Sequence, residues 1–293
     1  SGGPFEADDK RAPGVMTNPR PAARHRDAFA GEPFLPPPSF DEPDVSDKPS
    51  YVADLSPLAA WQRQALTTHN RERLRALRAV DDLVATVVGA LDETGRLDDT
   101  YVVYTSDNGF HMGQHRLFIG KTTAYEEDIR VPMAVRGPGV PPGQRLGQMV
   151  LNNDLAPTFA AIAGVEPPSF VDGRSFLKLL TKPETPWRRS FLIERRQMET
   201  HEIAGNAIID GIRTAKHTYV EYGTGERELY DLEKDPFQLA NQGETVDPAL
   251  LQAFAARLAE LKNCASLNCR ILEDLPVEPE ATPVAASEVQ VKG

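Results

Sequence analysis

The chain has 293 residues, 40% of them hydrophobic, and a formal net charge of -11 at pH 7. This length and apolar content suffice for one large α/β domain or two smaller ones. No apolar stretch approaches the roughly 20 residues that a membrane-spanning helix needs, and SGGPFE at the start lacks the basic and apolar blocks of a signal peptide. The acidic balance argues against a nucleic-acid partner, because nucleic-acid binders concentrate Lys and Arg on one face.

Residues 1–50 are predicted to form an irregular lead-in. They hold ten prolines and few periodic apolar positions, which is typical of extended or irregular chain. No first strand is available there to nucleate a sheet. We therefore expect the chain to begin in the middle of a domain.

A long amphipathic helix is predicted over residues 61–93. Its apolar positions recur at spacings of three and four from Leu66 to Leu91, apart from one polar gap, and Gly95 ends it. Strands are predicted at 101–104 and 131–137, and a short helix follows Asp154, which is expected to cap that helix or to contact a neighbouring loop. Helix, strand, loop, strand and helix form the alternation of an α/β sandwich.

The pattern changes after residue 185. Short strand-like pieces at 189–196, 207–223 and 227–232 are separated by Gly and charged turns, which indicates a small antiparallel sheet. Asp247-Pro248 then starts a helix whose apolar face is expected to pack across that sheet. This face consists of Leu250, Leu251, Phe254, Leu258 and Leu261.

A polar cluster, TSDNGFHMGQHRLFIGK, follows the strand at 101–104. Asp107 and the side-chain oxygen of Asn108 are hard donors suited to Ca²⁺ or Mg²⁺ at a strand end, where open α/β sheets bind ligands. Because a hard cation takes about six or more oxygens, the other ligands must come from elsewhere. The alternative is an Asp-Asn-Gly turn that only reverses the chain.

Three further side chains of this cluster are candidates for chemistry. His111 and His115 lie four residues apart, but the glycines around them favour a loop over a zinc-binding helix, so each is expected to bond a substrate oxygen, a carboxylate or the backbone. Lys121 suits a doubly charged oxyanion such as a sulfate or phosphate ester. Its alternative role is a surface lysine paired with Glu126 or Glu127.

Two cysteines, Cys264 and Cys269, occur in NCASLNC. Their spacing allows a small disulfide loop in an oxidising compartment. Two free thiols fit the same spacing, whereas a metal site would need more ligands nearby.

The motifs together resemble the sulfatase family of the alkaline-phosphatase-like superfamily, nearest to its glucosamine-6-sulfatase and arylsulfatase branch. The likeness extends in order over residues 39–270 and rests on four segments. They are FDEPDVSDKPSYV, YVVYTSDNGFHMGQHRLFIGKTTAYEEDIRVPMAVRGPGV, NNDLAPTFAAIAGVEPPSFVDGRSFLKLL and GIRTAKHTYVEYGTGERELYDLEKDPFQLANQ.

The resemblance implies an incomplete alkaline-phosphatase-like α/β sandwich with a small carboxy-terminal antiparallel sheet plus helix. The expected divisions are a Pro-rich lead-in at 1–50, the carboxy-terminal part of the sulfatase α/β domain at 51–184, the small sheet with its helix at 185–274, and a disordered tail at 275–293. The resemblance also implies a secreted, periplasmic or lysosomal protein.

For the site, the resemblance implies that Asp107 and Asn108 bind the catalytic Ca²⁺ and that Lys121 contacts the sulfate of a sulfated sugar or aryl sulfate. It implies that His111 and His115 line the pocket as catalytic residues, with His115 also binding substrate. The family's nucleophile is a formylglycine made from the Cys or Ser of C-x-P-S-R or S-x-P-S-R. Its hydrate attacks sulfur while the metal and the lysine stabilise charge.

This sequence contains neither nucleophile motif, and the early strand with its pair of metal-binding aspartates is also absent. The family's A-P-H-x-P segment is missing too, because Gly14 follows Ala-Pro here. The chain is therefore expected to be either the truncated carboxy-terminal part of a longer sulfatase or a remnant that no longer cleaves esters. Two alternatives to a sulfatase remain. One is a phosphodiesterase or phosphonate hydrolase of the same superfamily, over which the D-N-G form favours the sulfatase. The other is a non-catalytic protein that binds anionic glycans through Lys121.

Overall fold

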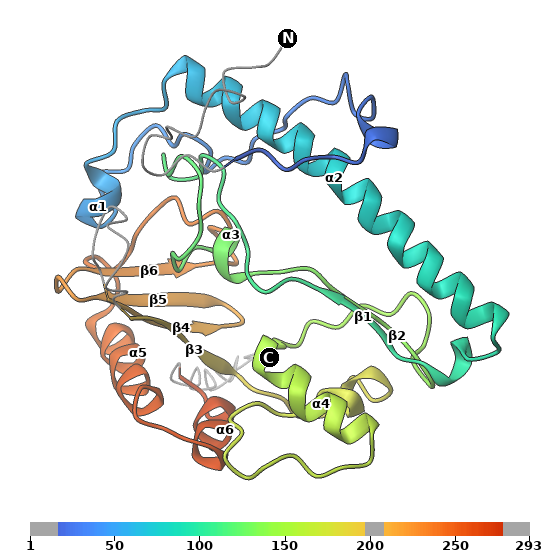
Figure 1. Ribbon diagram of the computed structural model, residues 1–293. Helices are drawn as coiled ribbons and strands as arrows, with labels where there is room; N and C mark the ends of the chain where they lie inside the picture. The colour runs from blue at the N-terminus through green and yellow to red at the C-terminus, as the bar shows by residue number, and fades with distance from the viewer. Residues whose placement is uncertain (1–16, 197–207, 278–293) are drawn as a thin grey trace, which may run out of the picture.

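A computed structural model describes residues 17–196 and 208–277 (Figure 1). Most of the predicted tail, from residue 278 onward, and residues 1–16 of the predicted lead-in lie outside the described residues. The described part of the lead-in is irregular apart from one 3₁₀ turn, η1 (Ala23–His25), before the short helix α1 (Ser50–Ala53). No helix in 17–196 or 208–277 is both long and apolar enough to cross a membrane.

The first layer contains the long helix and the two strands that the sequence predicts. Strand β1 (Val102–Thr105) pairs with β2 (Met133–Arg136) in antiparallel fashion, with Val103 opposite Val135. Met133 and Val135 of β2, with Tyr101 just before β1, pack on a buried cluster that includes Phe176 and Leu179. The elements are α2 (Ala60–Glu93), η2 (Leu97–Asp99), β1 (Val102–Thr105), α3 (Glu126–Ile129), β2 (Met133–Arg136), η3 (Asn152–Asp154), α4 (Leu155–Ile162) and η4 (Leu177–Leu180).

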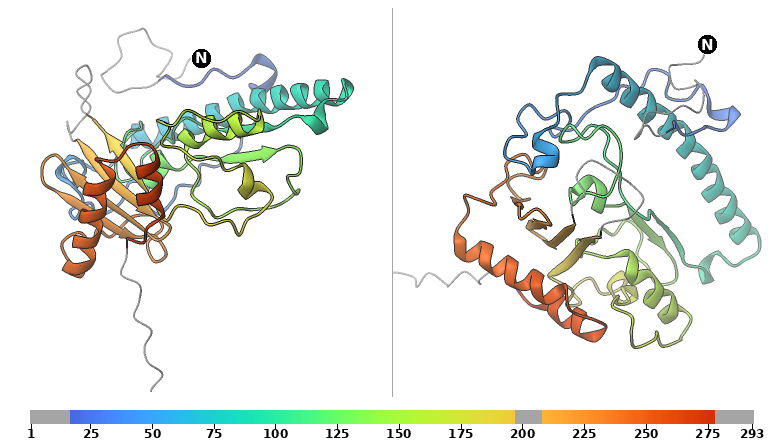
Figure 2. Two further views of the ribbon diagram at one scale, coloured as in Figure 1. Left: turned by 90° about the horizontal axis from the view of Figure 1, so that it is seen from below. Right: turned by 60° about the vertical axis from the view of Figure 1, so that its left-hand side comes forward.

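The second layer is a four-stranded antiparallel sheet in the order β3-β4-β5-β6. Its strands are β3 (Ser190–Arg195), β4 (Ile209–Thr214), β5 (His217–Tyr222) and β6 (Arg227–Asp231). Figures 1 and 2 show α5 (Pro248–Leu261) and α6 (Leu267–Asp274) along one face of this sheet. The predicted small sheet with a covering helix is therefore confirmed.

Helix α5 begins and packs as its sequence dictates. The side chain of Asp247 accepts a hydrogen bond from the backbone N–H of Ala249, at 2.9 Å, and proline occupies the first turn. The apolar face of α5 is buried against Ile212, Tyr219 and Leu229 of the sheet. Beyond its end, Cys264 and Cys269 form a disulfide with a Cα–Cα distance of 5.0 Å, so the structure selects the disulfide over two free thiols.

Asp154 departs from its predicted capping role. It precedes α4 but makes no side-chain capping bond to that helix. Its carboxylate instead accepts from the N–H of Leu151 and of Arg174, both at 2.8 Å, and forms a fully buried ion pair with Arg188. The tertiary partner outweighs the local preference, and the alternative expectation of a contact with a neighbouring loop is the one that holds.

Helix α2 has the predicted amphipathic pattern, but only its first part is covered. Ala65, Leu66 and His69 are buried. Farther along, Leu77 and Val84 are 45% and 40% exposed, although the pattern assigns them to the same face. Figure 1 shows this part of α2 extending along the outer edge of the molecule, away from the four-stranded sheet.

Candidate active site

The polar cluster, residues 105–121, begins at Thr105, the last residue of β1. The backbone N–H of Gly109 donates to the carbonyl of Asp128 at 2.8 Å, which brings two segments of chain together. A Cβ on Gly109 would lie 2.0 Å from the carbonyl oxygen of Glu127, so only glycine permits this approach. The glycine of Asp-Asn-Gly is therefore fixed by packing between segments and not only by a turn.

Lys121 lies beside Asn108 in the folded chain. Its Nζ donates a hydrogen bond to Oδ1 of Asn108 at 2.8 Å. An antiparallel bridge between His111 and Gly120, with N–O distances of 2.9 and 3.2 Å, closes the intervening loop. Lys121 follows this bridge directly, so the bridge fixes the position of its backbone. Thr122, the next residue, has φ of 85°, a strained conformation for a β-branched side chain of the kind that clusters at functional sites.

The glutamates considered as surface partners of Lys121 bond elsewhere. Glu126 accepts from Nε of Arg213 at 2.7 Å, and Glu127 accepts from Oγ of Ser39 at 3.0 Å. In the part of the chain that the structure describes, the ammonium of Lys121 is therefore directed at the Asp-Asn-Gly loop.

The Asp107 side chain is exposed at the same loop. One carboxylate oxygen accepts from the N–H of Asn108 at 2.9 Å, and no ion pair engages it among residues 17–196 and 208–277. The Nδ2 group of Asn152 donates to the carbonyls of Ser106 and Asp107, at 3.1 and 2.8 Å, and so holds the backbone of the loop. Sequence reasoning missed this contact, because no local pattern marks Asn152 as the partner of a loop 45 residues earlier in the chain.

Asp107 and Asn108 fit a hard cation by type but not by number. A carboxylate and an amide oxygen are donors that Ca²⁺ prefers, yet Ca²⁺ takes six to eight oxygens. No group of three or more His, Cys, Asp or Glu side chains is placed to hold a metal ion in the described parts of the chain. These two residues supply part of a cation site at most.

Both histidines of the cluster are buried against carboxylates and lie in a loop. Nδ1 of His111 lies 3.0 Å from both carboxylate oxygens of Asp128, and Nδ1 of His115 lies 2.7 Å from Oε2 of Glu42. The ring of His115 also stacks on Tyr125 at a centroid distance of 4.0 Å. The structure brings Lys121 to Asn108 but ties each histidine to a carboxylate, so their pocket-lining roles stay predictions.

Asp128 connects the two ends of the loop. Besides His111, its carboxylate accepts from the N–H and the Oγ1 of Thr123, at 2.9 and 2.7 Å. Since Thr123 follows Lys121 by two residues, one buried carboxylate orders the chain on both sides of the lysine. The sequence shows Asp128 only as one of three consecutive acidic residues, and its role depends on contacts that the sequence does not display.

The loop that carries Lys121 is anchored on the small sheet by a buried glutamate. Glu228 accepts hydrogen bonds from the phenols of Tyr125, Tyr222 and Tyr230. Burial raises the pKa of Glu228, and the three phenol bonds offset only part of that rise. Tyr125 follows Lys121 by four residues, so β5 and β6 form a platform for the candidate site.

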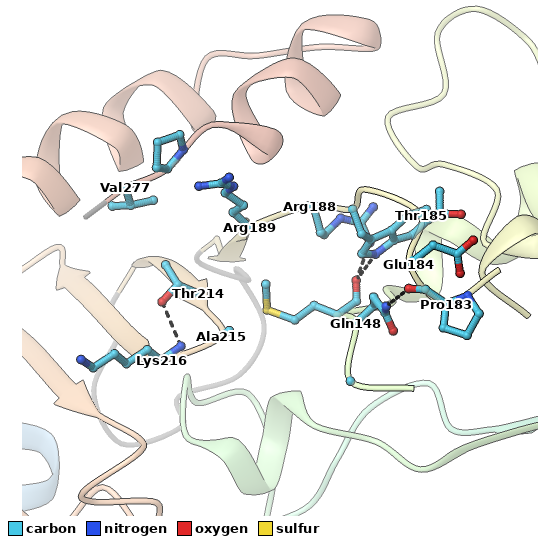
Figure 3. A pocket seen from close by; sticks show the side chains of 14 residues that line it. Gln148, Pro183, Glu184, Thr185, Arg188, Arg189, Thr214, Ala215, Lys216 and Val277 are labelled. Atoms are coloured by element: carbon cyan, nitrogen blue, oxygen red, sulfur yellow. Dashed lines mark hydrogen bonds between the residues drawn. The ribbon is translucent and has the colours of Figure 1, made fainter. Parts of the chain in front are cut away.

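A separate hollow of about 750 Å³ lies between the two layers. Figure 3 shows Arg189 and Lys216 on its walls, together with Gln148, whose side chain donates to the carbonyl of Pro183 at 2.6 Å. No residue of the predicted site lines this hollow.

Comparisons with known proteins identify the family of the chain. The sulfatase family model matches residues 23–165, and the model described as N-sulphoglucosamine sulphohydrolase, C-terminal, matches residues 113–263. The chain belongs to the sulfatase family, which confirms the resemblance seen in its motifs.

The chain is also similar to individual members of the family over part of their length. It is 36% identical over 245 residues to N-acetylglucosamine-6-sulfatase from Homo sapiens, which covers 73% of this chain and 44% of that protein. The chain thus spans less than half the length of this relative. A structure solved with its substrate D-glucosamine-2-N,6-O-disulfate is 29% identical, with a TM-score of 0.62 over 67% of this chain and 41% of that one.

A phosphonate monoester hydrolase of Agrobacterium radiobacter is also similar. It is 27% identical, with a TM-score of 0.61 over 69% of this chain and 43% of that one. The structural neighbours confirm the predicted alkaline-phosphatase-like fold with a small antiparallel sheet.

Proposed function

We propose that the chain is the carboxy-terminal part of a sulfatase that hydrolyses sulfate esters of sugars or aryl alcohols. The observation that carries the proposal is the 2.8 Å hydrogen bond from Nζ of Lys121 to Oδ1 of Asn108, beside the exposed carboxylate of Asp107. Oxygen donors for a cation and an ammonium group for an oxyanion thus lie in one ordered loop. This combination suits a sulfate ester, whose oxygens carry the charge that must be stabilised.

Each residue has a defined role in this proposal. Asp107 and Asn108 would contribute two ligands to Ca²⁺, which supplies a positive charge that polarises the sulfate. Lys121 would donate hydrogen bonds to a sulfate oxygen, held in position by the bridged loop that precedes it. His111 and His115 would order the loop that forms the wall of the pocket. The formylglycine nucleophile and the remaining ligands would come from chain outside this sequence.

The relatives and the disulfide support the proposed substrate class and location. One structural neighbour was solved with a sulfated glucosamine as its substrate, and a glucosamine sulfatase is among the similar proteins. A sulfated sugar is therefore the proposed substrate here. The Cys264–Cys269 disulfide supports a secreted, periplasmic or lysosomal location, because such bonds persist in oxidising compartments.

The test uses the intact gene product, matured to formylglycine and supplied with Ca²⁺, on a panel of sulfated sugars and aryl sulfates. Release of sulfate is expected, and Lys121→Ala should lower kcat/KM by about 10²–10³, as loss of one charge-stabilising donor does. Lys216→Ala is the matched control, because Lys216 pairs with Glu233 away from the site. Absence of sulfate release from every ester would reject the proposal.

Phosphonate or phosphate diester hydrolysis is the second candidate, since a structural neighbour is a phosphonate monoester hydrolase. Turnover of phenyl phosphonate esters in preference to aryl sulfates by the same preparation would select it. A non-catalytic glycan-binding remnant is the third. An in-frame C-x-P-S-R codon series upstream of residue 1 would argue against the remnant.

A further inference from the structure

One side chain from the segment before α4 holds the backbone of the Asp-Asn-Gly loop. The Nδ2 group of Asn152 donates to the carbonyl of Ser106 at 3.1 Å and to the carbonyl of Asp107 at 2.8 Å. Because carbonyls only accept, the NH₂ end of the amide must face the loop, and both of its N–H donors are used. Asn152 thus bonds two successive carbonyls that lie 46 and 45 residues earlier in the chain.

The backbone of Asn152 is itself fixed by its buried neighbour Asp154. The carboxylate of Asp154 accepts from the N–H of Leu151 at 2.8 Å, and the N–H of Asp154 donates to the carbonyl of Leu151 at 3.0 Å. These two bonds close the η3 turn around Asn152. The carboxylate of Asp154 is also paired with the fully buried Arg188. The amide of Asn152 therefore connects an exposed loop to a buried, ion-paired part of the chain.

The loop has a second anchor on its other flank. The N–H of Gly109 donates to the carbonyl of Asp128 at 2.8 Å. Between the two anchors, Oδ1 of Asn108 accepts from Nζ of Lys121 at 2.8 Å. With Asn152 on one flank and Asp128 on the other, the position of the loop relative to the lysine is set from both sides.

We propose that Asn152 is a positioning residue of the sulfatase reaction. It acts through the carbonyls of Ser106 and Asp107, and it keeps the two proposed cation ligands of the loop at a set distance from Lys121. The role requires no contact of Asn152 with substrate or cation. The inference rests on the proposed function, because it takes Asp107 and Asn108 to bind Ca²⁺ and Lys121 to bind the sulfate.

The exposure of Asn152 separates a positioning role from a structural one. Asn152 is exposed, and surface substitutions usually change stability little. A misplacement of about 1 Å in a reacting constellation, in contrast, costs about 10²-fold in rate. Loss of the two hydrogen bonds from Asn152 should therefore reduce catalysis far more than it reduces stability.

The test compares variants of the intact gene product, matured to formylglycine, by calorimetric titration with Ca²⁺ and by sulfate-ester kinetics at saturating Ca²⁺. Asn152→Ala should raise the Kd for Ca²⁺ about tenfold and lower kcat at least about tenfold, with KM changed less than about threefold. Asn152→Asp has nearly the same size but no N–H donor, so it should lower kcat in the same way.

The neighbouring Asn153 provides the matched controls. It is also exposed, and its side chain makes no hydrogen bond in the described parts of the chain. Asn153→Ala and Asn153→Asp should therefore leave kcat and the Kd for Ca²⁺ within about twofold of the wild type. The second control also accounts for the charge that Asn152→Asp adds near the cation.

Thermal melts of each variant separate positioning from folding. Asn152→Ala is expected to melt within a few degrees of the wild type, and Asn152→Asp takes its place if it fails to fold. A kcat and a Kd for Ca²⁺ that stay within about twofold of the wild type in Asn152→Ala would overturn the proposal. A wild type that binds no Ca²⁺ would also overturn it, because Asn152 would then position no cation ligand. A Kd that rises as expected in a protein that releases no sulfate would reject the proposed function and leave the positioning of the loop by Asn152 intact.

Discussion

Replacing Arg188 by methionine should be among the most destabilising single changes in the chain. The side chains of Arg188 and Asp154 are both fully buried, and Nη2 of Arg188 lies 2.7 Å from Oδ1 of Asp154. Nε of Arg188 also donates to Glu273 at 2.9 Å, and Nη1 donates to the carbonyl of Met149 at 3.0 Å. One guanidinium thus joins the start of α4, the segment before β3 and helix α6.

The magnitude follows from what the substitution leaves behind. Removing one member of a buried ion pair costs about 3–5 kcal/mol, since the other charge stays desolvated. Asp154 would keep its two backbone donors and Glu273 would keep Arg174 at 2.9 Å, which places the expected loss near 3 kcal/mol. Against a total stability of about 5–15 kcal/mol, this is a large fraction.

Urea unfolding at pH 7, followed by tryptophan fluorescence, measures these differences. Trp187 is a suitable reporter because Arg188 lies over its ring at 5.2 Å. Arg130→Met is the matched control, since this exposed arginine lies 3.7 Å from Glu126 and should contribute less than about 1 kcal/mol. A loss below about 1 kcal/mol for Arg188→Met would refute the reasoning.

Three further predictions concern other parts of the chain. Burial, and then the charge of Arg73, lower the pKa of His69 to about 4. The free energy of unfolding should therefore fall as the pH drops from 6.5 toward 4. An NMR titration should find this pKa of His69, and Arg73→Met should raise it. Because burial raises the pKa of Glu228 above 4.5, the wild type should gain stability relative to Glu228→Gln as pH falls from 7 to 4.5, and urea unfolding at the two pH values measures the change. Gly109→Ala should cost about 2 kcal/mol in a thermal melt, because the new Cβ would overlap the carbonyl of Glu127, and an unchanged melting temperature would contradict that packing.

Elements with a strong local pattern could be predicted from the sequence. Helix α5 has its cap, its proline and a regular apolar face within one stretch of 15 residues, from Asp247 to Leu261. The strands of the small sheet could also be predicted, because Gly and charged turns bound them. Asp154 shows where this approach fails, because its residue type favours a cap while its true partner, Arg188, lies 34 residues along the chain.

Some residues of the candidate site could be predicted from local sequence patterns, and others could not. Asp107, Asn108 and Lys121 could be chosen from residue type and from their place after a strand, and the structure brings Lys121 onto Asn108. Asn152 could not be chosen in this way, because it reaches the loop across 45 residues and no local pattern marks it. The spacing of four between His111 and His115 fits a helix as well as a loop, and the His111–Gly120 bridge decides for the loop.

The position of Lys121 depends on the distant small sheet as much as on its own loop. Tyr125 donates to Glu228 at 2.8 Å across 103 residues, and Glu126 accepts from Arg213 at 2.7 Å across 87 residues. Both contacts join the segment just after Lys121 to strands β4 and β6. Because the lysine is exposed and its neighbour Thr122 is strained, these anchors must hold the backbone in place. The small sheet therefore contributes to the candidate site by fixing its geometry, although none of its side chains bonds Asp107, Asn108 or Lys121 in the described structure.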